Sequence, residues 1–399
     1  MVKLVPLRQG ILLILVVTLA TILPIRVPRA HACDQCNFML SWGTNGVPFG
    51  VAVDSSGNVY VVDGYNNRVE KFSNEGQYVT SFGSQGTGDG QFSYPHYIAV
   101  DSAGLVYVAD AGNHRVEKFS SNGEYLTQWG TYGSGNGQFE WPLGITVDLS
   151  GYVYVADSAN SRVEKFNGDG EYINRWGSQG SSPGQFNDPS AIAVDSSGNV
   201  YVLDEGGYNS RVEKFSSNGA YLTQWGSQGS GKGQFFFQGH PSGGIAVDST
   251  GGVYVADTYN RRVEKFDGSG NYIFQWGSLG TGNGQFIYPE GIGLDFSDSV
   301  FVADSGNNRV EKFGDQSPSQ YPATSVPVQT AVPMEQVAVI LAVAVIVTSG
   351  ATYFAMRTRT KKATPYGSDE NSSRCIKCGT KLPLGAKFCD NCGANQPSG

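Results

Sequence analysis

The chain has 399 residues, of which 12% are aromatic, only 16% are charged and 54 are glycine. With no long helical pattern in its middle, this composition indicates a turn-rich, all-β protein. Residues 33–313 contain 30 Asp and Glu against 15 Lys and Arg, a net charge of −15. A body this acidic repels a phosphate backbone, so we expect no nucleic-acid partner for it.

Residues 1–32 have the features of a secretory signal peptide. A basic start precedes an apolar run at 11–25, and residues 30–32 form the A-x-A ending typical of a cleavage site. Arg26 and Arg29 are atypical of the last part of a signal, which leaves an uncleaved anchor as the alternative. In either case we expect the next part of the chain to be exported.

Two cysteines, Cys33 and Cys36, follow the signal. Because thiols outside the cytoplasm meet oxidising conditions, we expect a disulfide between them. Lipid attachment at Cys33 is disfavoured, since Ala30 stands where the attachment motif has Leu.

Residues 33–313 consist of repeats. Each unit has four segments rich in Val, Ile, Tyr, Phe and Trp, separated by turn-forming residues. Units of four short strands at this period are typical of β-propeller blades, so six units predict six blades. The third segment, Arg-Val-Glu-Lys-Phe, recurs at intervals of 47 to 51 residues, starting at Arg68, Arg115, Arg162, Arg211, Arg262 and Arg309.

The first and last units complement each other. The sixth unit stops at its third segment, 309–313, and a Pro/Ser/Thr-rich linker follows at 314–336. A lone end-piece at 37–43 precedes the first unit and matches the fourth segments at 125–130 and 221–226. We therefore predict that this N-terminal strand completes the last blade and closes the ring, which also covers a free strand edge.

These units resemble the NHL-repeat family. The resemblance is carried by Asp110-Ala-Gly-Asn-His-Arg-Val-Glu-Lys-Phe119 and its five relatives, by the Gly-Ile-Ala-Val-Asp before them and by Gly-Gln-Phe between units. It implies a six-bladed propeller that serves mostly as a binding platform. Two similar kinds of propeller are enzymes: peptide-amidating lyases, which hold zinc through three histidines, and gluconolactonase-like propellers, which bind calcium.

Residues present in all six units are expected to be structural, because one active site cannot recur six times. We expect the Asp that ends each second segment to pair with the repeated Arg. The Asn between them suits a turn, either by bonding its own backbone or by accepting a positive φ. These residues are Asp63, Asp110, Asp157, Asp204, Asp257 and Asp304, and Asn66, Asn113, Asn160, Asn209, Asn260 and Asn307.

Positions that differ between units carry the candidate binding face, because the turns after the second strands and the crossings between blades emerge on one side of a propeller. Exposed aromatic residues with Arg are typical of interfaces, and aromatics also stack on sugars. The alternative is that most of them pack between blades. The candidates are Phe49, His96, Tyr97, His114, Trp141, Tyr208, His240, Tyr259, Arg261, Tyr288 and Glu290, together with Tyr65, Phe236 and Phe237.

A second pattern concerns the mouth of the central channel. The residue after the proline that opens each blade is expected to ring that mouth. These residues are Phe49, His96, Leu143, Ser190, Ser242 and Glu290.

The sequence offers little support for catalysis. The propeller has only three histidines, His96, His114 and His240, and their spacing does not assure that they converge on one metal. The repeated Asp residues suit calcium or ordinary turns. We therefore expect no catalytic residues, and a propeller enzyme of lyase or lactonase type is the alternative.

The apolar run at 337–356 has 20 residues and no charge, long enough to cross a bilayer as a helix. The basic flank that opens 357–373 follows it, which indicates a cytoplasmic tail. The sequence thus predicts a single-pass protein of the cell membrane with an extracytoplasmic propeller.

The tail contains two C-x-x-C pairs, Cys375/Cys378 and Cys389/Cys392, with ten residues between them. Four thiolates at this spacing suit a closed tetrahedral Zn²⁺ site, and a ribbon this small folds only with its metal. Residues 374–394 resemble a small zinc-ribbon family, and we expect a structural zinc and a cytoplasmic protein partner.

The expected function is that of a membrane-anchored binding or scaffold protein. Its propeller would bind an external protein or glycan, and its zinc ribbon would dock a partner inside. A purely structural, envelope-organising module is a third interpretation.

Overall fold

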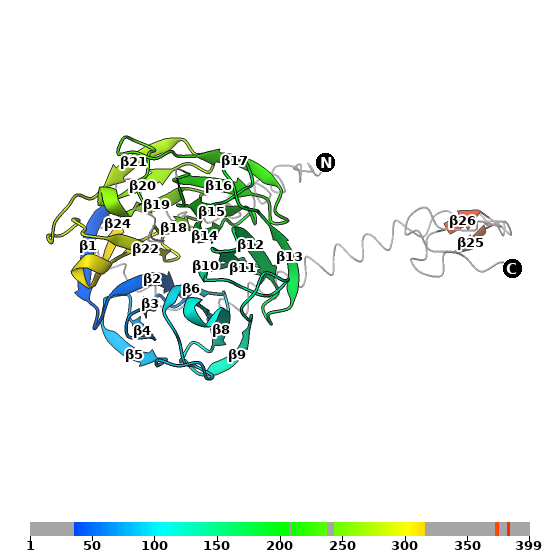
Figure 1. Ribbon diagram of the computed structural model, residues 1–399, viewed down its shortest axis with the longest axis horizontal. Coiled ribbons are helices and arrows are strands. Elements are labelled where there is room, and N and C mark those ends of the chain that lie inside the picture. The colour runs from blue at the N-terminus through cyan, green and yellow to red at the C-terminus, as the bar shows by residue number, and fades with distance from the viewer. Residues whose placement is uncertain (1–35, 208, 238–242, 316–371, 375–380, 384–399) are drawn as a thin grey trace, which may run out of the picture. The chain divides into compact units, whose positions relative to one another are not determined.

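The computed structural model describes residues 36–207, 209–237, 243–315, 372–374 and 381–383. The chain divides into two units, residues 1–318 and 319–399. The first contains six four-stranded antiparallel sheets arranged around a central axis (Figure 1). The prediction of an all-β, six-bladed propeller is confirmed.

In each blade the first strand lies nearest the axis and the fourth lies outermost. The bounds are β2 (Pro48–Val53), β3 (Val59–Asp63), β4 (Arg68–Phe72) and β5 (Tyr78–Phe82) in blade 1; β6 (Pro95–Val100), β7 (Val106–Asp110), β8 (Arg115–Phe119) and β9 (Tyr125–Trp129) in blade 2; β10 (Pro142–Val147), β11 (Val153–Asp157), β12 (Arg162–Phe166) and β13 (Tyr172–Trp176) in blade 3; β14 (Pro189–Val194), β15 (Val200–Asp204), β16 (Arg211–Phe215) and β17 (Tyr221–Trp225) in blade 4; β18 (Ile245–Val247), β19 (Val253–Asp257), β20 (Arg262–Phe266) and β21 (Tyr272–Trp276) in blade 5; and β22 (Pro289–Leu294), β23 (Val300–Asp304), β24 (Arg309–Gly314) and β1 (Asn37–Gly43) in blade 6.

The middle strands are the core of the propeller. Every residue of β7, β11 and β19 is buried, because neighbouring blades cover both faces of each sheet. The outer strands alternate between exposed and partly buried residues, as strands with one solvated face do. Trp129 at the end of an outer strand packs on Phe166 of the next blade, with ring centroids 5.9 Å apart, and such pairs join consecutive blades.

The N-terminal strand closes the ring, as predicted. β1 pairs antiparallel with β24, from Asn37 opposite Gly314 to Gly43 opposite Arg309, and Figure 1 shows the two side by side. Trp42 repeats the contact between blades, since its ring centroid lies 6.0 Å from that of Phe72 in blade 1.

The repeated Asp and Arg pair within each blade, as predicted. In blade 2, Arg115 Nε donates to Asp110 Oδ2 at 2.8 Å, and its Nη2 lies 2.5 Å from Glu117. The same guanidinium donates to the carbonyls of Thr87, Gly88 and Gln91 in the crossing from the preceding blade. The network therefore fixes the crossing to the blade that follows it.

The role expected for the repeated Asn was wrong. Its side chain does not bond its own backbone and its φ is not positive. Instead, Asn113 Nδ2 donates to Asp110 Oδ2 and to the Gly86 carbonyl. The left-handed conformation falls on the next residue, such as His114 with φ 56°. Short 3₁₀ turns form here in three blades: η1 (Ala111–Asn113), η2 (Thr258–Asn260) and η3 (Ser305–Asn307).

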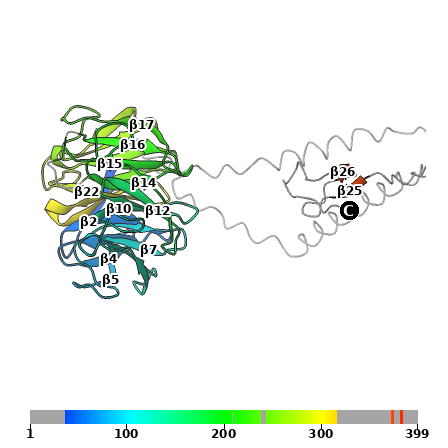
Figure 2. The same ribbon diagram turned by 45° about the vertical axis from the view of Figure 1, so that its right-hand side comes forward.

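The strands run between two faces of the propeller (Figure 2). One face carries the starts of the inner strands and the ends of the second strands, since Pro48 pairs with Asp63 and Pro289 with Asp304. The other face carries both ends of the propeller chain, because Asn37 and Gly314 pair there.

In the second unit, the described residues form one antiparallel pair, β25 (Ser372–Arg374) with β26 (Lys381–Pro383). Among the described residues, no helix is long and apolar enough to cross a membrane. The predicted signal at 1–32 and span at 337–356 lie outside those residues.

Candidate functional site

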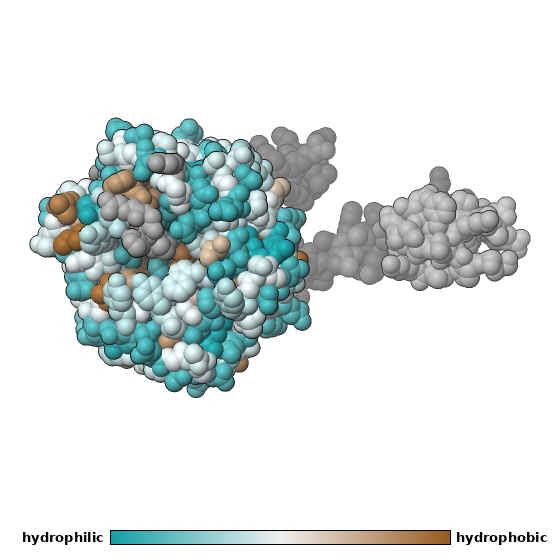
Figure 3. Space-filling model, viewed as in Figure 1, coloured by the Kyte–Doolittle hydropathy of each residue, from teal (hydrophilic) through white to brown (hydrophobic). Residues whose placement is uncertain are grey.

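The face that carries the second-strand ends contains a cavity of about 480 Å³. We call it the aromatic pocket. The surface seen in Figure 3 is mostly hydrophilic, and its hydrophobic residues lie near the centre and at one edge. The pocket is formed by blades 1, 2, 5 and 6 and is lined by Val47, Phe49, Tyr65, Tyr94, His96, Thr258, Tyr259, Tyr288, Glu290, Ser305 and Gly306.

One wall of the pocket comes from blades 1 and 2. Phe49 stacks on His96 with ring centroids 5.0 Å apart and meets Tyr65 edge-on at 5.3 Å and Tyr94 at 5.8 Å. Phe49 and His96 are buried at the starts of inner strands, whereas Tyr65 is 61% exposed at the rim. Because these rings brace one another, the wall is a preformed apolar surface.

The backbone of Tyr94 is unusual. Its φ of 54° lies in the left-handed region, which bulky residues seldom adopt and which costs about 1–3 kcal/mol. Asn67 in the turn of blade 1 holds it there, since the Tyr94 N–H donates to Asn67 Oδ1 at 2.7 Å. This conformation places the Tyr94 ring beside Phe49 and His96, with centroids 5.8 and 6.2 Å away.

The opposite wall comes from blades 5 and 6. Tyr259 and Tyr288 meet at a centroid distance of 5.7 Å, near perpendicular to each other. The Arg261 guanidinium lies 4.4 Å from the Tyr288 centroid and 5.3 Å from that of Tyr259. This is a cation–π arrangement, and Arg261 also donates to the Thr258 carbonyl.

Glu290 brings a carboxyl group to the axis side of the pocket, on inner strand β22. Ser305 Oγ donates to it at 2.7 Å. Burial raises the pKa of Glu290 to about 8, and the negative charge of Asp304 adds to this against the opposing effect of Ser305. The charge of Glu290 also contributes to raising the pKa values of Tyr94 and Tyr259.

His96 is the second polar group deep in the pocket. Burial lowers its pKa to about 4, so the imidazole is neutral at pH 7. Its Nδ1 is buried and has no hydrogen-bond partner among the described residues. A buried nitrogen without a partner is costly and marks a place where a ligand or water can bond.

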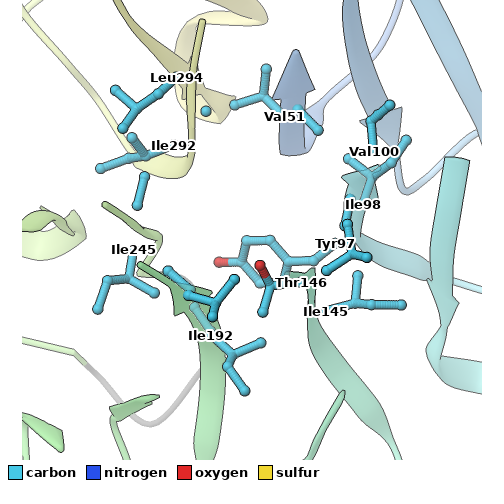
Figure 4. Close-up of a pocket in the computed structure, with 18 of the residues that line it drawn as sticks. Val51, Tyr97, Ile98, Val100, Ile145, Thr146, Ile192, Ile245, Ile292 and Leu294 are labelled. Carbon is cyan, nitrogen blue, oxygen red and sulfur yellow. The ribbon is translucent and has the colours of Figure 1, made fainter. Parts of the chain in front are cut away.

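Below the pocket the axis is narrow and aliphatic. A smaller cavity of about 200 Å³ is lined by the inner strands of all six blades, including Val51, Ile98 and Ile145. Figure 4 shows Tyr97 reaching across this ring of side chains. Its hydroxyl donates to the Gly243 carbonyl at 2.7 Å. Tyr97 thus crosses the channel from blade 2 toward blade 5.

Glu205 lies close to this crossing. Its Oε1 accepts hydrogen bonds from Ser190 Oγ at 2.5 Å and from the Gly243 N–H at 2.8 Å. Burial is the largest effect on the pKa of Tyr97 and raises it, and the charges of Glu205 and Glu290 add to the shift. The Tyr97 hydroxyl therefore stays protonated and bridges the channel through its hydrogen bond to Gly243.

Part of the predicted binding face lines the aromatic pocket, and the other predicted residues lie elsewhere. Phe49, His96, Tyr259, Tyr288 and Glu290 line one pocket together with Tyr65. Arg261 lies beside it, while Tyr97 lines the aliphatic channel. His114 and Trp141 do not line the pocket but lie next to it. The backbone N–H of Trp141 donates to His114 Nδ1 at 3.2 Å, and the Trp141 ring centroid lies 6.0 Å from that of Tyr94. Tyr208 and His240 lie outside the described residues.

The expectation that these aromatics are exposed was wrong for four of them. Phe49, His96 and Tyr97 are 5%, 4% and 8% exposed, because inner-strand side chains point toward the axis and the neighbouring blade. Phe237, at 3%, is also buried. Packing between blades, the stated alternative, applies to this subset.

The predicted ring of residues after the opening prolines is also only partly at the pocket. Phe49, His96 and Glu290 line it. Leu143 is fully buried in the core, and Ser190 is fully buried against Glu205. Ser242 lies outside the described residues. The ring is unequal because the blades carry residues of very different size at this position.

Sequence reasoning missed five residues at the pocket: Val47, Tyr94, Thr258, Ser305 and Gly306. Tyr94 precedes an opening proline, as Trp141 and Tyr288 do, so its position could have been compared with theirs. Thr258 and Ser305 follow the repeated Asp, where the other blades have Gly, Ala, Ser or Glu. Variation at this position is the signal that could have found them.

No group of three or more His, Cys, Asp or Glu residues that could hold a metal occurs among the residues described. Cys375, Cys378, Cys389 and Cys392, the predicted zinc ligands, lie outside them. Cys36 is disulfide-bonded and its partner is outside the described residues, so the pairing with Cys33 stays a prediction.

Comparison with protein families identifies NHL repeats at residues 47–72, 92–119, 186–215 and 243–266. These ranges fall in blades 1, 2, 4 and 5. A zinc-ribbon domain is identified at residues 374–395, which contain all four cysteines of the tail. No curated protein matches the chain.

Several solved structures share the propeller fold. A protein of unknown function from Bacteroides thetaiotaomicron is 20% identical, with a TM-score of 0.52 over 72% of this chain and 73% of that one. A gluconolactonase from Xanthomonas campestris is 14% identical, with a TM-score of 0.51 over 71% and 97%. A virginiamycin B lyase from Staphylococcus aureus is 13% identical, with a TM-score of 0.49 over 70% and 100%. At these identities the likeness concerns the fold alone.

Proposed function

From a chain that carries NHL repeats in a six-bladed propeller and a zinc-ribbon domain, we propose a membrane-anchored extracytoplasmic binding protein. In this proposal the aromatic pocket of the propeller binds a group on an external protein or glycan. The zinc ribbon, folded around one Zn²⁺, docks a cytoplasmic protein.

The observation that carries the proposal is the construction of the pocket. Four blades contribute aromatic walls, and the polar side chains besides the tyrosine hydroxyls are those of Glu290, His96, Thr258 and Ser305. Concave sites with apolar walls and a small number of placed polar groups are typical of ligand binding. The strain at Tyr94, held by Asn67, is further support, because backbone strain concentrates at functional positions.

The course of the chain through the propeller suits an anchored protein. The inner strands start at the pocket face and the third strands run away from it, so Gly314 and Asn37 lie at the opposite face. The chain therefore leaves the propeller at the face opposite the pocket. The predicted signal and the basic flank after the predicted span support an extracytoplasmic propeller.

The enzyme alternative has one observation in its favour. Glu290, whose pKa is about 8, lies in the same pocket as the neutral His96. Carboxyls with raised pKa values in clefts are typical of general acids. In a lyase or lactonase of this kind, the Glu290 carboxyl would deliver a proton to the leaving oxygen of the substrate.

The function can be tested by photo-cross-linking in intact cells. A photoreactive amino acid at Tyr288, on the wall of the pocket, should capture a discrete external partner. The same group at Tyr78, which is exposed on outer strand β5, serves as the control. Equal capture at both positions, or none at Tyr288, would contradict a binding role for the pocket.

The zinc ribbon is tested by metal analysis of the full-length protein. About one zinc per chain is expected, and it should be lost in the double variant Cys375→Ser/Cys378→Ser, because two thiolates cannot close the site. Retention of zinc in that variant would place the metal elsewhere.

A further inference from the structure

The charge of Glu290 has no partner of opposite sign within the described part of the chain. Ser305 Oγ donates a hydrogen bond to its carboxyl, and the charge that acts on it is the negative one of Asp304. Arg261, the cation beside the pocket, is stacked on Tyr288 and donates to the Thr258 carbonyl instead. A partly buried carboxylate in this position is complementary to a positively charged ligand.

The walls around that carboxyl suit the same kind of ligand. Tyr65, Tyr94, Tyr259 and Tyr288 present aromatic rings to one cavity. The faces of aromatic rings attract ammonium groups by about 0.5–2 kcal/mol each, and most strongly where water is excluded. Since Arg261 already stacks on Tyr259 and Tyr288, the rings left to a ligand's cation are those of Tyr65 and Tyr94, which act together with the carboxylate of Glu290.

His96 adds a hydrogen-bond acceptor. Since its imidazole is neutral, one ring nitrogen carries a lone pair. Its Nδ1 is the buried atom without a partner. A primary ammonium has three donors and can bond both Glu290 and His96, whereas a quaternary ammonium has none.

We propose that the aromatic pocket binds the ε-ammonium group of a lysine side chain on an external protein, with Glu290 as its counter-charge. The four methylenes of lysine pack along the tyrosine walls, while the charged end reaches Glu290 and His96. An amino sugar fits less well, because its hydroxyls need partners and both Thr258 Oγ1 and Ser305 Oγ already donate to oxygens of this chain. The inference rests on the binding function proposed above.

Binding should depend on pH through Glu290, which must ionise to pair with the ligand. Asp304 acts on Glu290, and the charge of Glu290 acts on Tyr94, Tyr97 and Tyr259. His96 lines the same pocket, Arg261 lies beside it on Tyr288, and Glu205 also acts on Tyr97 and Tyr259. The raised pKa values of the tyrosines keep them protonated, and His96 stays neutral above its pKa of about 4. With the pKa of Glu290 at about 8, affinity should rise about tenfold from pH 6 to pH 7 and level off above pH 8.

The test is calorimetric titration of the full-length protein at pH 8 with Nα-acetyl-lysine methylamide. The neutral isostere Nα-acetyl-norleucine methylamide, tetramethylammonium and glucosamine are titrated in parallel. Glu290→Gln keeps the size and the bond from Ser305 but removes the charge. Its matched control is Glu124→Gln, at an exposed glutamate far from the pocket in sequence and position.

The wild-type protein should bind the lysine probe more tightly than the other three ligands. The Glu290→Gln variant should bind the lysine probe at least tenfold more weakly than the wild type does, and the Glu124→Gln variant should bind it as the wild type does. Equal binding of the neutral isostere, or of the lysine probe to the Glu290→Gln variant, would overturn the inference. Preference for glucosamine or tetramethylammonium would overturn the choice of lysine. If cross-linking at Tyr288 succeeds while the lysine probe fails to bind, the ligand class is wrong and the proposed function stands.

Discussion

Two sets of charged residues lie at the same end of the blades and differ in whether a buried carboxyl has a cation beside it. In the repeated network, Arg115 lies between Asp110 and Glu117 and also donates to three backbone carbonyls. At the pocket, Glu290 has a hydroxyl partner and no cation among the described residues. The network pairs its buried carboxyls with a cation, while the Glu290 carboxyl at the pocket has none within the described part of the chain.

This difference follows from repetition. A residue found in every blade meets the same neighbours six times, so its partners can recur with it, as Asn113 and Arg115 recur with Asp110. A residue found in one blade, such as Glu290, has no repeated partner. A buried carboxyl without a cation can therefore arise where the blades differ, and such positions are the ones to examine for ligands.

The largest effect is expected from removing residues 37–43, the strand that closes the ring. Without it, β24 becomes a free edge, and the contacts of Trp42 with Phe72 and Phe301 are lost. We expect the cooperative thermal transition of the propeller to disappear. Trp42→Ala alone should cost about 3 kcal/mol, as for other large aromatic truncations. An unchanged melting temperature in the deletion variant would refute closure by β1.

The comparison between network and pocket predicts opposite responses to charge removal. Arg115→Ala leaves Asp110 and Glu117 buried without their cation, which should cost about 3–5 kcal/mol of unfolding free energy. Glu290→Gln removes a charge that has no cationic partner, so the free energy of unfolding should stay constant or rise. Denaturant titration of both variants measures the free energy of unfolding. A larger loss of that free energy in Glu290→Gln than in Arg115→Ala would mean that Glu290, rather than the network, has the structural role.

Most of the fold could be predicted because the sequence pattern of one blade recurs in six units. The strand segments, the pairing of Asp with Arg and the closing role of 37–43 all follow from comparing units within the chain. The left-handed turn residue was misplaced by one position, since Asn113 and His114 both suit such a turn by type. Only the hydrogen bonds of Asn113 to Asp110 and Gly86 decide between them.

The site was harder to predict, because side-chain direction depends on the tilt of the inner strands. Phe49 and His96 were correctly selected as variable aromatics but lie buried in the wall. Tyr97, one residue further along β6, turns to the axis and bridges to Gly243. Adjacent positions on a strand face opposite ways, and a sequence pattern shared by only one or two blades cannot say which way.

Comparing wild type with Glu290→Gln as the pH rises should reveal the titration of Glu290 alone, because the network carboxyls, such as Glu117 with a pKa also raised to about 8, are present in both proteins. The Glu290 pKa of about 8 exceeds the value of about 4.5 that the unfolded chain has, so the folded state binds more protons between these values. Stability of the wild type should therefore fall as pH rises through this window, relative to Glu290→Gln. After allowance for partial exposure, the difference between pH 5 and pH 8 should be about 2 kcal/mol. Parallel stability curves for the two proteins would show that the Glu290 carboxyl titrates normally.

The smallest predicted effect concerns Asn67, whose side chain bonds the backbones of two pocket residues: its Oδ1 accepts from the Tyr94 N–H, and its Nδ2 donates to the Tyr65 carbonyl at 3.3 Å. Asn67→Gly keeps a residue that accepts the left-handed φ of 54° but removes the oxygen that bonds the Tyr94 N–H. Loss of that bond, worth about 1 kcal/mol, frees the strained Tyr94 backbone to relax and should weaken binding of the lysine probe about fivefold. Asn308→Gly is the matched control, because Asn308 has the same conformation in blade 6, with φ 51°. Calorimetry should show weaker binding only for Asn67→Gly, with similar melting temperatures for both. Equal affinities would mean that the Tyr94 ring is positioned by its aromatic neighbours rather than by the turn of the preceding blade.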